Sequence, residues 1–177
     1  MTRFTTDPLL GIARIVTIAL MGLMVFLAAV CTLAIPVVLF NDDAIRVNID
    51  GVSQHPEAGT FYLVALLLAA VIALLVMLFV FFRHLKRIIE SVAIGDPFVP
   101  ENARRLTAMA WLMLAIQLAL IPIVAMGLEI GNRLGEVDAE GYGGLDLSGI
   151  VMVIVLFILA RVFRTGAAMR EDLEGTV

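Results

Sequence analysis

Three uncharged, apolar stretches of this chain are long enough to cross a lipid bilayer, at residues 15–40, 58–82 and 106–128. A hydrocarbon core of about 30 Å requires about 20 residues of α-helix. Lipid offers no water to the backbone, so such a stretch satisfies its peptide groups by forming a helix. The sequence therefore predicts an all-α integral membrane protein, and its 62% content of hydrophobic residues disfavours a soluble domain.

A fourth apolar stretch, residues 147–160, is interrupted by Arg161 after 14 residues. At about 1.5 Å per residue this is too short to cross alone. If Arg161 extends its guanidinium group into the headgroups, the helix continues and the span covers residues 147–163. Asp146 or Ser148 would cap its start. A re-entrant or surface helix is the alternative. We expect one domain, residues 1–177, folded as a four-helix bundle.

The distribution of Lys and Arg predicts the orientation of these spans. Ten of the 12 basic residues lie in three segments: two before residue 15, five in the loop 83–105, and three from Arg161 onward. The loops 41–57 and 129–146 have one each. Because basic residues concentrate in cytoplasmic segments, both termini and the loop 83–105 are expected in the cytoplasm. The expected location is a bacterial cytoplasmic (inner) membrane.

Two short amphipathic helices are predicted on the cytoplasmic side. The second span is expected to continue to Ile94, with Gly95 ending it. A C-terminal helix is expected after the fourth span. Their apolar positions, at helical spacing, are Leu85, Ile88, Ile89 and Val92 in the first, and Val162, Gly166, Met169 and Leu173 in the second.

Four basic residues are expected to contact lipid headgroups: Arg83, Lys86, Arg87 and Arg161. A docking surface for a cytosolic protein is the alternative for the basic loop. Phe98 lies in a turn between Pro97 and Pro100, and it either packs under its own bundle or contacts a partner.

The loop between the first two spans alternates apolar and polar residues at 44–51, which predicts a short extracytoplasmic strand. Ala65, Ala69 and Ala73 form a stripe of small residues on the second span. Such stripes let helices approach closely. The stripe indicates packing within the bundle or, alternatively, a homo-oligomer contact.

The sequence offers no constellation for catalysis or metal binding. His55 and His84 are predicted on opposite sides of the membrane, and Cys31 is the only cysteine. Gln117 is the main polar residue inside a span, and an interhelical hydrogen bond is its expected role. Glu129 is the one acid near a span that would suit a gate. We expect no enzyme, no cofactor and no catalytic or metal-binding residue.

Two cytoplasmic motifs resemble a known family. The first is Gly95-Asp96-Pro97-Phe98 followed by Asn102 and Leu106, and the second is the tail from Val162-Phe163-Arg164-Thr165-Gly166 to Val177. Together with four spans, they resemble the domain-of-unknown-function 2975 family of bacterial membrane proteins over nearly the whole chain. Its members are typically encoded beside a very small helix-turn-helix protein of the Xre/Cro type. The resemblance implies a membrane partner that tethers or inhibits such a DNA-binding regulator.

The expected function is therefore that of a membrane-embedded regulatory protein, responding to a membrane or envelope signal, with no direct nucleic-acid binding of its own. A small transporter or channel subunit is the alternative. It would need a polar path through the bundle, for which Gln117 and two prolines are weak support. The candidate residues for binding the regulator are Phe98, Met169, Leu173, Glu171, Asp172 and Glu174.

Overall fold

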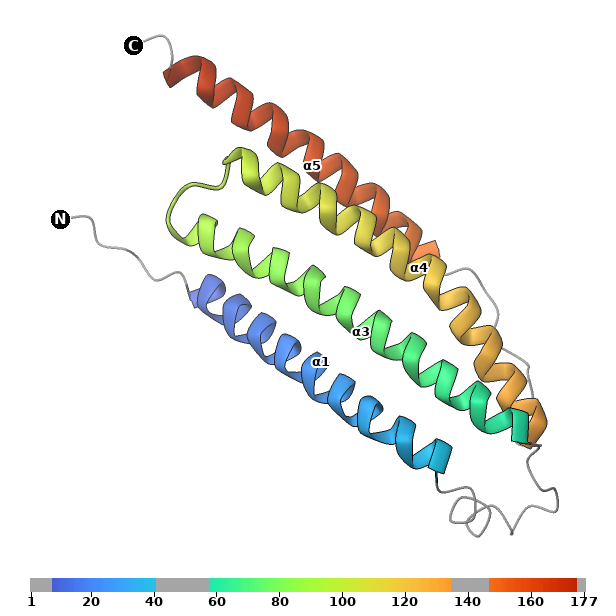
Figure 1. The fold of residues 1–177 in the computed structure, drawn as a ribbon. Helices are drawn as coiled ribbons and strands as arrows, with labels where there is room; N and C mark the ends of the chain where they lie inside the picture. Colours follow the sequence, from blue (N-terminus) through green and yellow to red (C-terminus); the bar gives the residue numbers. More distant parts are fainter. Residues whose placement is uncertain (1–7, 41–57, 135–146, 175–177) are drawn as a thin grey trace.

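The computed structural model describes residues 8–40, 58–134 and 147–174. They form four long helices, α1 (Pro8–Phe40), α3 (Ala58–Ala93), α4 (Pro100–Leu134) and α5 (Leu147–Glu174) (Figure 1). These residues contain no strand. The strand predicted at 44–51 lies outside the described residues, as does Asp146, one of the two predicted caps of α5.

Each helix contains one of the four apolar stretches, and each is long and apolar enough to cross a bilayer. The protein is thus an all-α, multi-pass membrane protein. The residues predicted to form short amphipathic helices belong to the ends of α3 and α5, which continue without a break from the apolar parts of these helices. The limits of the spans and the side on which each end lies stay predictions.

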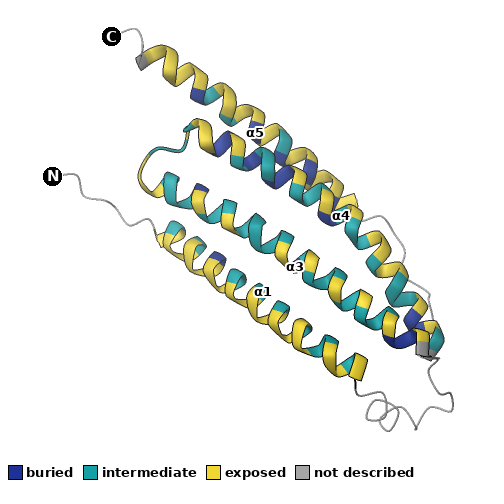
Figure 2. Ribbon diagram, viewed as in Figure 1, coloured by how far each residue is buried: buried dark blue, intermediate teal, exposed yellow. Residues whose placement is uncertain are grey.

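The helices pack in chain order, α1 on α3, α3 on α4, and α4 on α5. Figure 1 shows them as a row with alternating directions, so the start of α1, the turn between α3 and α4, and the end of α5 lie at the same end. Among the described residues, α1 and α5 form no interface of comparable extent with each other. Thr17 is the one buried residue described in α1. The outer face of α1 is exposed along its length (Figure 2).

The apolar core lies where α3, α4 and α5 meet, in the half of the helices nearest the turn. Its buried members are Ile88, Leu106, Met109, Ala110, Leu156 and Ala160. The predicted alanine stripe on α3 is not part of this core. Ala69 and Ala73 are exposed, so the expectation that the stripe packs within the bundle is not met at these two positions.

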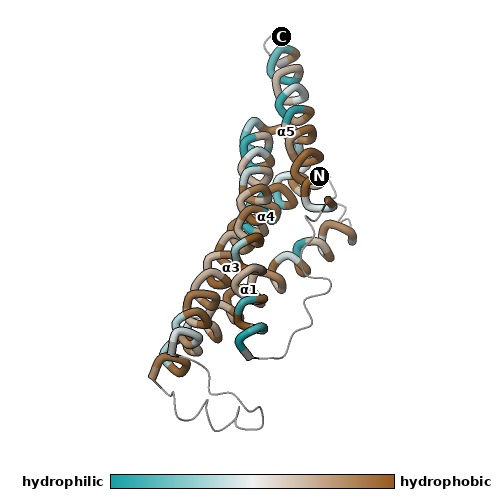
Figure 3. The backbone as a smooth tube through the Cα atoms, turned by 90° about the vertical axis from the view of Figure 1, so that its right-hand side faces the viewer, coloured by the Kyte–Doolittle hydropathy of each residue, from teal (hydrophilic) through white to brown (hydrophobic). Residues whose placement is uncertain are grey.

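α5 is displaced along α4 toward the end that carries the turn. A Cβ atom on Gly149, near the start of α5, would overlap the side-chain amide of Gln117, so α5 starts level with the middle of α4. At its other end α5 extends past the turn (Figure 1). Hydrophilic residues gather on this extension (Figure 3). The displacement leaves Ile121 and Val124 of α4 exposed, because α5 does not reach them.

The turn after α3 is made by Gly95, as the sequence predicts. Its φ is +88°, a conformation that side chains with a Cβ rarely adopt. The amide of Gly95 donates to the carbonyl of Val92 (3.0 Å), and the amide of Asp96 donates to that of Ser91 (3.1 Å). These two bonds form a Schellman motif, which satisfies the last carbonyl groups of α3. Pro100 then begins α4, a position where its missing amide hydrogen costs nothing.

We predict that Gly95→Ala lowers the free energy of unfolding by about 1–2 kcal/mol, the cost of a left-handed conformation for a residue with a Cβ. Thermal unfolding in detergent would measure it. Gly22→Ala is the matched control, because Gly22 lies within α1 and an added Cβ would meet no atom within 4 Å. This control should leave stability unchanged or raise it. Equal shifts for both variants would contradict the prediction.

Candidate functional site

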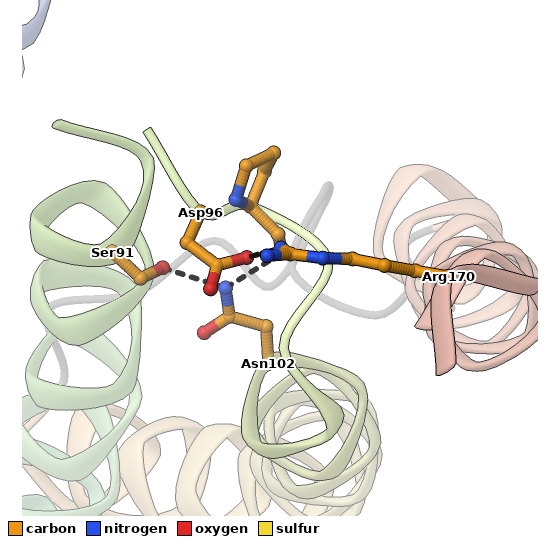
Figure 4. A network of polar contacts seen from close by, with 5 residues as sticks. Ser91, Asp96, Asn102 and Arg170 are labelled. Atoms are coloured by element: carbon orange, nitrogen blue, oxygen red, sulfur yellow. Dashed lines mark hydrogen bonds and ion pairs between the residues drawn. The ribbon is translucent and has the colours of Figure 1, made fainter. Parts of the chain in front are cut away.

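Asn102, at the start of α4, holds the turn in place. Its side chain is fully buried, with 0% exposed. Nδ2 donates to Oγ of Ser91 at 2.6 Å (Figure 4). It also donates to the carbonyl of Pro97 at 2.9 Å, and Oδ1 accepts from Nη1 of Arg105 at 2.8 Å. The Oγ of Ser91 in turn donates to the carbonyl of Ile88 (2.8 Å). A buried amide without partners would cost about 1–3 kcal/mol, so these bonds tie the end of α3, the turn and α4 together.

The turn contacts α5 through an ion pair and an aromatic side chain. Nη1 of Arg170 donates to Oδ1 of Asp96 (Figure 4). The ring of Phe98 packs against Phe163, with centroids 5.3 Å apart and planes tilted by 41°. A Cβ atom on Gly166 would lie 2.8 Å from Cδ1 of Phe98, so the absence of a side chain at Gly166 makes room for this ring.

These contacts join the two motifs that carry the family resemblance. We call the combined surface the turn–tail face and define it by its residues: Asp96 and Phe98 from the turn, and Phe163, Gly166, Met169, Arg170 and Leu173 from α5. Sequence reasoning did not foresee the pairing of Asp96 with Arg170, which are 74 residues apart. Nor did it foresee that Asn102 is the buried residue that organises the turn. No periodicity or spacing in the sequence points to either.

The candidate partner-binding residues differ in their surroundings. Phe98 is 42% exposed, and the rest of its surface packs on α5. Met169 and Leu173 are 58% and 71% exposed, near the end of α5. Glu171 and Asp172 are exposed beside them. Glu174 is the last residue of α5, and its side chain lies outside the described part of the chain. That any of them binds a partner stays a prediction.

The four residues predicted to contact lipid headgroups do not form one group. Lys86 of α3 forms an ion pair with Glu90, Nζ to Oε1 3.7 Å, and Glu90 also lies 3.8 Å from Nη2 of Arg14. Arg83 and Arg87 are exposed on α3, and Arg161 is exposed on α5. Glu90 thereby links α1 to α3 at this end of the row. Lipid contact by these residues stays a prediction.

The two residues predicted as candidates for a transport path, Gln117 and Glu129, both contact other side chains or helices. Gln117 packs over Gly149 at the start of α5 and so lies at a helix contact. Glu129 forms an ion pair with Arg133 one turn away, Oε1 to Nε 2.8 Å. Among the described residues, no three His, Cys, Asp or Glu side chains come close enough to hold a metal ion.

The four apolar helices, with a polar junction at one end, define a multi-span membrane protein. The family model described as "Protein of unknown function (DUF2975)" matches residues 46–177. The chain belongs to this family. The match includes α3, α4, α5 and the whole turn–tail face, and it begins after α1. Comparison with curated proteins and with solved structures found no match.

We predict that Asp96→Asn speeds hydrogen exchange in the end of α5 by up to about fivefold. Asp96 and Arg170 are both partly exposed, and a pair of this kind contributes at most about 1 kcal/mol. Hydrogen–deuterium exchange with peptide-level mass spectrometry would measure it. Glu101→Gln is the matched control, because it removes an acid paired with Arg104 within α4. Equal exchange of the α5 peptides in both variants would show that the ion pair does not hold this helix end.

Proposed function

We propose that this protein is a membrane-embedded regulator that tethers or inhibits a small cytosolic helix-turn-helix transcription regulator. The observation that supports this most is the turn–tail face. It joins two segments far apart in the sequence through the Asp96–Arg170 ion pair and the packing of Phe98 on Gly166. A surface built from both family motifs is the arrangement expected of a binding face. The nature of the partner comes from the family resemblance.

The proposal places the turn–tail face in the cytoplasm of a bacterium, with both termini on that side of the inner membrane. Basic residues support this orientation, because they are concentrated at the end of the helices that carries the turn. Among the described residues they are Arg14, Arg83, Lys86, Arg87, Arg104, Arg105, Arg161, Arg164 and Arg170. A regulator held here would be kept away from DNA until a membrane or envelope signal changes the packing of the helices.

The end of α5 offers two ways to bind such a partner. Helix-turn-helix domains carry basic residues on the face that reads DNA. Acids such as Glu171 and Asp172 would compete with DNA for that face, and this mode would weaken with added salt. Alternatively, the exposed Met169 and Leu173 would anchor an apolar surface of the partner, with little dependence on salt. Phe98 has a supporting role in both modes, because it positions α5 beside the turn.

The orientation is tested by cysteine labelling in a Cys31→Ser background. Single cysteines at Asp96 and Glu171 should react only from the cytoplasmic side, and those at Asp50 and Asp138 only from the opposite side. The reason is the concentration of basic residues in alternate segments. Impermeant maleimide, added to intact cells and to inverted vesicles, gives the measurement. Labelling of positions 96 and 138 from the same side would contradict a four-span topology.

The partner is tested by co-purification of the full-length protein, in mild detergent and low salt, with the small helix-turn-helix protein that the family resemblance implies is encoded beside it. We expect Met169→Gln with Leu173→Gln to reduce recovery of the partner at least tenfold if the apolar mode operates. Glu171→Gln with Asp172→Asn should do so if the acidic mode operates. Phe98 is left intact, because changing it would also disturb its packing on Gly166.

Ile94→Gln is the matched control for the apolar variant. Ile94 is an exposed apolar residue at the same end of the molecule but outside α5. It should leave recovery of the partner unchanged. The proposal is wrong if two results are found together. No small DNA-binding protein co-purifies with the wild-type chain, and deletion of the gene for the membrane protein leaves transcription of the regulator's target genes unaltered.

A further inference from the structure

The basic side chains at the end that carries the turn divide into those paired with an acid and those without one. The paired ones are Lys86 and Arg14, both with Glu90 (3.7 and 3.8 Å), Arg104 with Glu101 (2.8 Å), and Arg170 with Asp96. Arg83 and Arg87 have no carboxylate within ion-pair distance among the described residues. Because no described carboxylate compensates their charges, they are available to an anion.

These two arginines lie close to a third on the neighbouring helix. Arg83 and Arg87 are one turn apart on α3, and both are exposed. Arg105 of α4 lies at the same end of the contact between these two helices, because Asn102 accepts from Arg105 and donates to Ser91, which is one turn beyond Arg87 on α3. Nη1 of Arg105 donates to Oδ1 of Asn102 at 2.8 Å. This bond is to a neutral amide, so it orients the guanidinium group without neutralising its charge. Three positive charges therefore lie at the end of the α3–α4 contact that carries the turn.

The position of the three arginines along the helices indicates what kind of anion they meet. Arg83 directly follows the apolar residues 58–82, and Arg105 directly precedes the apolar residues 106–128. In a protein whose apolar residues lie in the hydrocarbon, both are at the level of the lipid headgroups. Basic pockets between transmembrane helices at this level bind the headgroups of anionic lipids.

We propose that Arg83, Arg87 and Arg105 form a binding site for the phosphate of an anionic phospholipid, between the ends of α3 and α4. The guanidinium fork donates two parallel hydrogen bonds to phosphate oxygens, which suits this ligand better than the point charge of a lysine. A zwitterionic lipid carries a phosphate too, but the three cations repel its ammonium group. The inference is independent of the proposed regulatory function, since it requires no protein partner.

Native mass spectrometry of the full-length protein in detergent, titrated with phosphatidylglycerol or phosphatidylcholine, tests the site. We expect one phosphatidylglycerol to bind at least tenfold more tightly than phosphatidylcholine. Arg83→Gln and Arg87→Gln should each weaken phosphatidylglycerol binding roughly fivefold, the effect of about 1 kcal/mol per basic residue near a membrane surface. Arg83→Lys with Arg87→Lys keeps both charges but removes both forks, and should lie between the wild type and the double Gln variant.

Arg104→Gln is the matched control, because it removes one positive charge from the same end of α4 but from a residue already paired with Glu101. It should leave phosphatidylglycerol binding unchanged.

Equal weakening by Arg104→Gln would indicate attraction by the overall charge, and unaltered binding in the double Gln variant would show that the lipid sits elsewhere. Displacement of the lipid by an equal concentration of inorganic phosphate would indicate a site for free anions. Each of these three results would overturn the proposal. Unchanged thermal unfolding of every variant verifies that it is folded.

Discussion

The buried amide of Asn102 sets the geometry of the end of the molecule where the helices pack most closely. In an apolar protein, an amide removed from solvent must find its hydrogen bonds within the chain. Asn102 finds them on three sides, at Ser91 of α3, at the carbonyl of Pro97 and at Arg105 of α4. The turn is therefore fixed relative to both helices. Asp96 and Phe98 are held facing α5 as a result, and the last helix packs against a surface that the first turn of α4 has already defined.

The helices that share the apolar core are the ones that match the family model. α3, α4 and α5 share the apolar core, and they are the helices included in the family match. α1 packs on α3 outside this core, and Glu90 links the two at one end through Arg14. A helix that contributes little to the core can vary in sequence with small effect on the fold. The part of the chain that matches the family model is thus the group of three helices that share the core, and α1 packs along one side of it.

The sequence predicted the helices well and the contacts between them poorly. Every span crosses a bilayer of the same thickness, so each needs an apolar stretch of similar length. The hydropathy of the sequence was therefore enough to predict the four helices. Gly95 was recognisable because few other residues adopt its backbone conformation. The roles of Asn102 and Gly166 were not recognisable, because both depend on which helix faces which. Hydropathy does not encode this choice, since lipid is as apolar as the side chains that it contacts. Asp96 and Arg170 illustrate the same difficulty, because nothing in either local sequence indicates the other.

The packing of each helix on its predecessor has a consequence for how the protein is made. A ribosome releases the helices into the membrane in the order α1, α3, α4, α5, and each one finds its neighbour already present. No helix has to wait for a later one or insert between two that have already met. The turn–tail face differs, because it joins the turn after α3 to Gly166 and Arg170 of α5, the last of these helices to be made. That surface exists only after α5 has been made, so a chain that lacks α5 occupies the membrane without presenting it.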